Sequence, residues 1–231
     1  MQQLKNCQNT LIINKLQWSD RSILNEGGFQ WGFLTMSIRV DQSYIHWNYF
    51  IALESDLAQV SRYIEFNTKN FRTYSIELAH LLLATSSEVD VIAKGICKYL
   101  DPATRPENIF DYRTIIKQNL PEFAKETTYI PRFDLTLRPW SNWIRNKSPL
   151  WWQSYNNVKH ERSEHFQDAN LKNVLNSMGG LLIAVFYFYK LQFINEGEHI
   201  QSNRDVTRKL GSGLDFLKLR DDYYYGYLLL E

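Results

Sequence analysis

The longest apolar segment, residues 166–193, limits most strongly what this chain can fold into. Its apolar residues recur at helical spacing, and residues 178–189 are almost wholly apolar. That stretch of about 12 residues is shorter than the ~20 that a membrane-spanning helix needs. We therefore expect a buried helix at the centre of a core. Within it, Gly179 and Gly180 each weaken the helix by up to ~1 kcal/mol, which indicates the close approach of another helix.

Four more segments predict helices around that centre, because apolar side chains recur in them near helical spacing. They are residues 44–66, 75–100, 109–120 and 149–160. Asp101-Pro102 ends the second of these helices, since the residue before a proline leaves helical geometry. Ser148-Pro149 starts the last one, because serine can accept a bond from a free amide and proline fits the first turn. The sequence therefore predicts a mainly α protein with a helical bundle over residues 44–193.

Small β elements are expected near the N-terminus and around residues 128–140. Residues 11–13 and 33–40 predict short strands within an N-terminal extension, residues 1–43. The segment at 128–140 alternates and carries prolines near both ends, a pattern typical of an extended excursion or an edge strand rather than a central strand. We expect these elements to decorate the helical bundle.

A C-terminal extension, residues 194–231, follows the bundle. Residues 195–213 are polar and contain glycine, which predicts a loop or linker. Residues 214–230 are rich in tyrosine and leucine and predict a strand. We expect that strand to pair with one from the first 43 residues.

Composition narrows the classes of function. The chain has 231 residues, of which 44% are hydrophobic, and a net charge of +1, so its surface is not basic throughout. Cys7 and Cys97 have no metal-ligand spacing, and two cysteines in a chain of this size predict a reducing compartment. The polar N-terminus lacks the apolar segment of a secretory signal. We therefore expect a cytoplasmic protein without cofactor or membrane partner.

A cluster of polar and ionisable residues precedes the long apolar segment, and we expect chemistry there. It comprises Asn156, Lys159, His160, Arg162 and His165. Histidine exchanges protons near neutral pH, and arginine stabilises charge that develops on a phosphate. His160 and His165 make a poor metal pair, since five residues place them about 140° apart on a helix. A structural role for Asn156 and His160, in capping a helix or bonding the backbone, stays open.

The run Tyr155-Asn156-Asn157-Val158-Lys159-His160 resembles the signature of HEPN domains. In that signature an arginine, often followed by asparagine, precedes a histidine by four to six residues. Asn156 and His160 match the motif, whereas Tyr155 stands at the position of the arginine. The resemblance, over roughly residues 45–193, implies an all-helical, commonly dimeric bundle. Many such proteins are metal-independent ribonucleases in toxin–antitoxin and phage-defence systems. A longer pattern that includes residues 87–90 resembles an uncharacterised bacterial family, which implies no activity.

The resemblance and the chemistry together select candidate residues. The predicted catalytic residues are His160, Asn156, Arg162, Lys159 and Glu88, and the predicted RNA contacts are Tyr155 and Arg145. Because Tyr155 replaces the motif arginine, the cation must come from Arg162, Lys159, Arg145 or a second subunit. Arg162 can serve only if the helix breaks at residues 161–163, since it otherwise lies nearly opposite His160. Glu88 is expected to reach the cluster from an upstream helix.

Two functions stay open at this point. The first is a metal-independent endoribonuclease, acting as a homodimer in phage defence or as a toxin. The second is a non-catalytic helical module that binds RNA or a cognate protein partner. Four crowded tryptophans at positions 140–152 would then form its interface, although such residues more often build a core wall.

Overall fold

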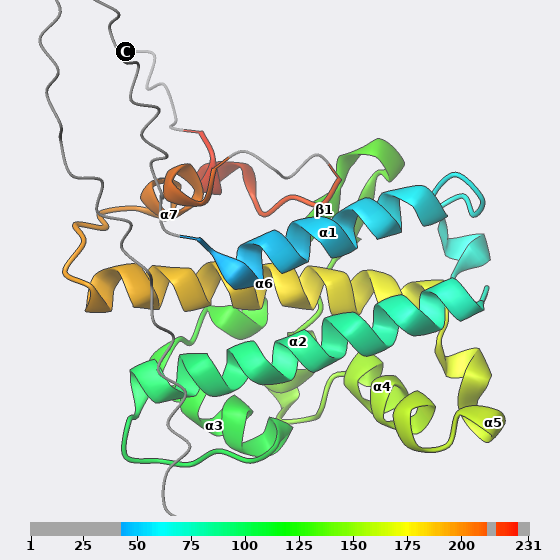
Figure 1. Ribbon diagram of the computed structural model, residues 1–231, viewed down its shortest axis with the longest axis horizontal. Coiled ribbons are helices and arrows are strands. Elements are labelled where there is room, and N and C mark those ends of the chain that lie inside the picture. Colours follow the sequence, from blue (N-terminus) through cyan, green and yellow to red (C-terminus); the bar gives the residue numbers. More distant parts are fainter. Residues whose placement is uncertain (1–42, 212–215, 226–231) are drawn as a thin grey trace, which may run out of the picture. The chain divides into compact units, whose positions relative to one another are not determined.

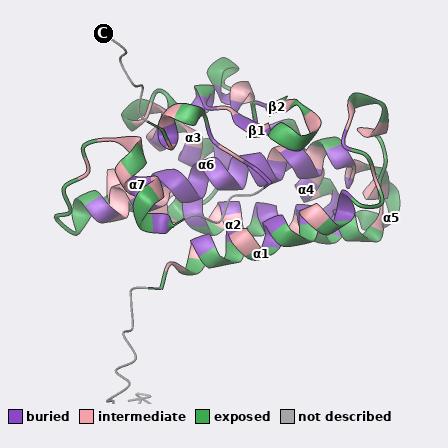
Figure 2. Cartoon of the chain, turned by 90° about the horizontal axis from the view of Figure 1, so that it is seen from above, coloured by how far each residue is buried: buried purple, intermediate pink, exposed green. Residues whose placement is uncertain are grey.

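The fold is built around α6, Leu171–Asn195, in a computed structural model that describes residues 43–211 and 216–225 (Figure 1). Asn170 caps this helix by accepting a bond from a backbone amide of the first turn at 3.2 Å. The helix is long and apolar enough to cross a membrane, but 78% of its most apolar window is buried inside the protein. That burial, visible in Figure 2, is compatible with the central helix of a soluble protein. The predicted buried helix is confirmed, with residues 166–170 outside it.

Seven α-helices and one two-stranded sheet make up the regular structure of the described residues, so the mainly α prediction is confirmed. The other helices are α1 (Ile45–Val60), α2 (Ile76–Leu100), α3 (Ile109–Asn119), α4 (Leu150–His160), α5 (Arg162–His165) and α7 (Asn203–Leu210). The described residues all belong to one compact unit. The strands predicted at 11–13 and 33–40 lie outside the described residues.

α2 and α6 lie side by side and run in the same direction (Figure 1). The hydroxyls of Thr85 in α2 and Ser177 in α6 are hydrogen bonded at 2.8 Å, and both side chains are buried. Further along, Gly95 faces the ring of Phe188. α1 crosses the pair in the opposite direction. These three helices therefore enclose the main apolar core.

α1 ends earlier than its apolar pattern predicts. The helix stops at Val60, whereas the pattern continued to residue 66. The reason is that Phe66 turns back into the core, where its ring lies 5.0 Å from that of Phe133. Asn67 then starts a single 3-10 turn by accepting bonds from two following amides. An apolar residue that follows a helix can thus prolong the periodic pattern without prolonging the helix.

The β element predicted around residues 128–140 is confirmed, but it is a hairpin of two short strands rather than a single edge strand. β1 (Thr128–Ile130) pairs antiparallel with β2 (Leu135–Leu137). Asp134 makes the return with a φ of 50°, a left-handed conformation that aspartate tolerates. The hairpin and the chain after it pack on α6.

The four crowded tryptophans all belong to the core. Trp140 and Trp143 are 0% exposed, Trp151 is 2% exposed and Trp152 is 7% exposed. The Trp140 indole donates to the Gly180 carbonyl at 3.2 Å. The core-wall interpretation is therefore confirmed, and the interpretation of these indoles as an exposed interface is wrong.

The two glycines of α6 do allow other segments to approach closely, as expected. One of these segments is the helix α4, and the other is the strand β1. A Cβ atom at Gly179 would lie 2.4 Å from Thr128 Oγ1 of β1. A Cβ atom at Gly180 would lie 3.1 Å from the Trp151 ring of α4. The missing side chains therefore let the hairpin and α4 sit directly on α6.

The loop predicted at residues 195–213 is wrong in part, because it contains α7. Ser202 and Asp205 form a capping box at its start, and only Val206 and Leu210 are buried on its inner face. A helix of eight residues with two buried apolar positions gives too little periodicity to be recognised in a sequence.

The strand predicted at residues 214–230 is wrong for its described part, residues 216–225. Lys218 alone pairs, by two backbone bonds of 2.7 and 2.9 Å to Tyr129 of β1. A buried carboxylate holds the segment on the bundle, since Glu54 accepts the Leu217 amide at 2.7 Å. The described part of the C-terminal extension therefore belongs to the same compact unit as the bundle.

Candidate functional site

α4 carries most of the predicted site, and its core face fixes its position. Trp151, Tyr155 and Val158 point inward, and the Trp151 indole donates to the Pro139 carbonyl at 2.9 Å. Pro149 precedes the first helical residue, and no side chain caps this end. The predicted capping bond from Ser148 is wrong, because its Oγ is buried without a partner. Packing of the aromatic residues, rather than capping, therefore places α4.

The chain leaves helical geometry between His160 and Arg162. α4 ends at His160, Glu161 leaves helical geometry with φ −137° and ψ 52°, and α5 begins at Arg162. Arg162 is exposed and belongs to α5, so the helical geometry of α4 does not determine its direction. The condition stated for Arg162, a break at residues 161–163, is therefore met. We call residues 156–165 the α4–α5 corner.

Tyr155 does not present a surface to a ligand. Its side chain is 5% exposed, and its ring lies 5.3 Å from that of Trp152. The ammonium of Lys159, which is exposed, lies 5.3 Å from the centre of the Tyr155 ring. Burial of the tyrosine argues against the predicted RNA contact, whereas Lys159 supplies a cation beside the position of the motif arginine.

His160 and Asn156 lie at the corner without a partner in the part of the chain that the structure describes. His160 is exposed and Asn156 is half-buried. At 3.6 residues per turn, His160 lies roughly 20° from Gln153 around the helix axis. His160 therefore continues the outer face of α4 to the end of the helix. His165, by contrast, lies within 3.5 Å of Glu161 and 3.7 Å of Asp168.

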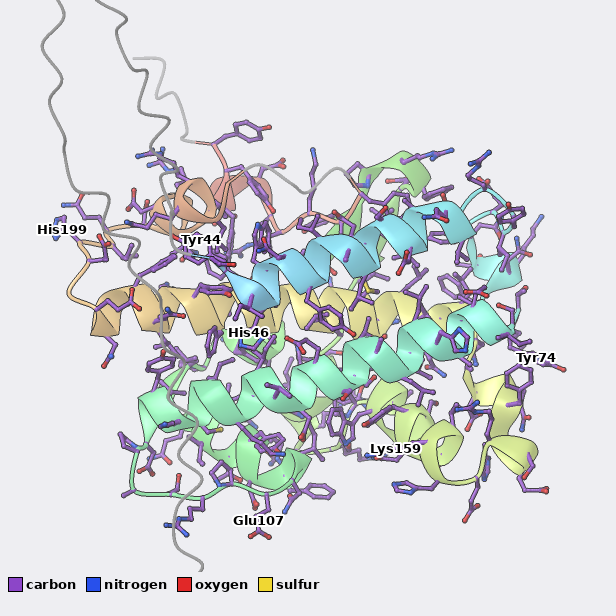
Figure 3. The ribbon with its side chains drawn as sticks, in the orientation of Figure 1. Tyr44, His46, Tyr74, Glu107, Lys159 and His199 are labelled. Carbon is purple, nitrogen blue, oxygen red and sulfur yellow. The ribbon has the colours of Figure 1, made fainter. Side chains whose placement is uncertain are left out.

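Glu88 does not join the cluster. Its carboxylate is 2.5 Å from Nδ1 of His46 in α1, and both side chains are mostly buried. The backbone amide of His46 donates to the Tyr189 hydroxyl at 3.1 Å. Figure 3 places His46 well away from Lys159 of the corner. Glu88 therefore helps to hold α1 on α2 and α6 instead of facing His160.

Arg145 lies at the opposite end of α4 from His160. It ends the 3-10 turn Ser141–Arg145 and is exposed. Lys117 of α3 fixes this turn by donating to the Trp143 carbonyl at 3.0 Å and to the Asn146 side chain at 2.7 Å. The 11 residues of α4 separate the two sites by roughly 16 Å. Arg145 is therefore not a cation for chemistry at His160.

A polar groove of 680 Å³ runs along the outer face of α4. One wall is α4, another is the turn after α1, and the third is the start of α6. Its lining residues with charge or amide groups are Lys69, Arg72, Gln153, Asn157, Asp168, Asn170, Lys172 and Asn173. Three cations thus face the groove with one carboxylate. We call it the cationic groove.

The groove is assembled by backbone bonds between distant segments. The Leu171 amide donates to the Thr73 carbonyl at 2.9 Å, and the Lys172 amide donates to the Phe71 carbonyl at 3.2 Å. These bonds bring Arg72 and Lys172, a hundred positions apart in the sequence, to one surface. Because no local pattern links the two segments, this groove could not be predicted from the sequence.

The single acid of the groove is already partnered. Asp168 accepts a bond from the Asn157 amide at 2.9 Å and lies 3.7 Å from His165. Lys69, Arg72 and Lys172 are exposed and form no ion pair among the described residues. The groove can therefore offer three positive charges to an anionic ligand.

The described residues contain no group of three histidine, cysteine or acidic side chains placed to hold a metal ion. Comparison with protein-family models, curated proteins and solved structures found no match.

Proposed function

We propose that this protein is a HEPN-like helical bundle that binds single-stranded RNA in the cationic groove. The observation that carries the proposal is the convergence of Lys69, Arg72 and Lys172 on one groove with a single, already partnered carboxylate. Phosphates on an RNA backbone are the repeated anions that such a row of cations binds. The proposal also rests on the resemblance carried by Asn156 and His160.

Charge and surface chemistry favour RNA over other anionic ligands. The net charge of +1 is too low for binding over the whole surface, so the positive charge of the groove acts locally. Amide side chains such as that of the exposed Gln153 line the groove together with the cations and can bond sugar hydroxyls and base edges. An extended single strand can follow a groove of this kind, since its backbone is flexible.

The test is the salt dependence of binding. We expect the Arg72→Ala/Lys172→Ala variant to lower the slope of log K against log salt by about 1.4, or 0.7 for each lost phosphate contact. A labelled single-stranded RNA of about 12 nucleotides suits the measurement, being within the site sizes of single-strand binders. The matched control is Arg204→Ala/Arg208→Ala, which removes two exposed cations from α7. Equal slopes for the two double variants would rule out the groove as the RNA site.

A second candidate function, metal-independent RNA cleavage, is favoured by one observation. His160 is exposed and unpartnered among the described residues, at the end of the α4 face that lines the groove. In this reaction the His160 imidazole takes the proton of a 2′-hydroxyl, and the 2′-oxygen attacks the adjacent phosphorus. The bond to the 5′-oxygen breaks, and that oxygen takes a proton from water. Arg162 and Lys159 stabilise the charge that develops on the phosphate oxygens.

The cleavage step is tested with purified protein, RNA and EDTA. We expect His160→Ala to abolish cleavage while the fold is retained. His165→Ala is the matched control, because His165 is the neighbouring histidine and is tied to Glu161 and Asp168. A folded His160→Ala variant that cuts RNA at the wild-type rate would refute the catalytic role. A homodimer, a cognate protein partner and a setting in phage defence or a toxin–antitoxin system belong to the same proposal.

A further inference from the structure

A second cavity, of 370 Å³, lies beside the cationic groove, where α5 packs against the start of α2. Its lining residues are Ile76, Ala79, His80, Arg162, Ser163 and Phe166. Ile76 is 64% exposed, although it is apolar. The cavity therefore offers apolar walls with a few polar groups, the composition typical of small-molecule pockets.

Aromatic residues shape one side of this cavity. Phe166 is half-buried, and the edge of the Tyr74 ring meets it with the ring centres 5.4 Å apart. Tyr74 itself is 50% exposed and stands at the end of the bundle where α2 begins (Figure 3). A flat aromatic ligand entering here would meet an aromatic ring, and the planar guanidinium of Arg162 would lie beside it.

The cavity and the cationic groove are neighbours. Tyr74 pairs with Asn170 in an isolated backbone bridge. Asn170 lines the groove, and Tyr74 contacts Phe166, which lines the cavity. A strand of RNA whose phosphates lie in the groove can therefore direct one base across this bridge.

We propose that this cavity holds one unstacked nucleobase of the RNA whose backbone occupies the cationic groove. The inference rests on the proposed function and specifies its ligand as single-stranded, because a base in a duplex cannot leave its stack without cost. Phe166 supplies the stacking surface, and Arg162 lies beside the base with Ser163 and His80 as hydrogen-bonding groups.

The experiment compares Phe166→Leu with Phe110→Leu, a control at a half-exposed ring on α3 outside the cavity. We expect Phe166→Leu to weaken binding of single-stranded RNA by roughly fivefold to a hundredfold, the loss that removal of one stacking ring causes. The salt dependence should not change, because no phosphate contact is lost. We expect the variant and the wild type to bind equally well to an RNA with an abasic residue at the bound position.

A second variant of a cavity residue tests the proposal independently, in case Phe166→Leu does not fold. Arg162→Lys keeps the charge of the exposed side chain but removes its planar face, so we expect weaker binding with an unchanged salt slope. If both variants bind intact RNA like the wild type while Arg72→Ala/Lys172→Ala lowers the slope, the base cavity is refuted and the RNA groove stands. If the full-length wild type binds no RNA, both proposals fall.

Discussion

The substitution Gly179→Ala tests how the hairpin is seated on α6. Alanine favours the helix by about 1 kcal/mol over glycine, so on an open helix it would stabilise the protein. Here the new Cβ would lie 2.4 Å from Thr128 Oγ1 and 3.1 Å from Pro139, and Thr128 is 0% exposed. Overpacking of a core costs up to ~3 kcal/mol. We therefore expect the free energy of unfolding to fall by about 2 kcal/mol in urea titrations.

The same reasoning predicts what removes the effect. In a Thr128→Ala background the obstructing hydroxyl is absent, and Gly179→Ala should cost less than about 1 kcal/mol or stabilise the helix. Gly180→Ala is the control, because its Cβ meets Trp151 and should cost the same in both backgrounds. An equal loss for Gly179→Ala with and without the Thr128 side chain would refute this explanation.

Two further variants test buried polar contacts, each by urea unfolding. Burial raises the pKa of the Tyr187 and Tyr223 hydroxyls, so both stay protonated and donate to Glu126 at 2.9 and 2.5 Å. Glu126→Ala leaves both donors without their acceptor, so we expect the free energy of unfolding to fall by about 2–4 kcal/mol. A fall of less than about 1 kcal/mol would contradict this hydrogen-bond network. His46→Phe leaves the Glu88 carboxylate, which is 14% exposed, without its partner. We expect the free energy of unfolding to fall by about 1–2 kcal/mol, and an unchanged value would contradict the structural role of this pair.

The helical part of the fold could be predicted because its signals are local. Ser75 and Asp101 mark both ends of α2, and the structure begins and ends that helix beside them. The apolar pattern also identified α6 as the buried centre. Periodicity failed at Phe66, whose burial comes from a turn, and at α7, whose two buried residues are too few to form a pattern.

The site was predictable only along α4. The sequence grouped His160, Asn156 and Arg162 in one short run, but it left open whether the helix breaks at Glu161, as the structure shows it does. The sequence could not show that Glu88 pairs with His46, because this contact depends on how α1 lies across α2. Nor could it show that Tyr155 faces the core.

The cationic groove depends on contacts between distant parts of the chain. Residues 68–72 and 170–173 come together through the backbone bonds of Thr73 and Phe71 with α6. Each segment alone is an unremarkable polar connection between helices. Sites of this kind follow from tertiary structure, so they cannot be predicted from the composition or periodicity of either segment.

The most direct test of RNA binding in the groove is photo-crosslinking of a 4-thiouridine RNA to the full-length protein, followed by peptide mapping. We expect crosslinked peptides from residues 68–72 and from the region around residues 150–173, which line the groove and the corner. Their yield should fall as the salt concentration rises. The absence of crosslinks, or crosslinks confined to other surfaces such as α3 or α7, would contradict the proposed function.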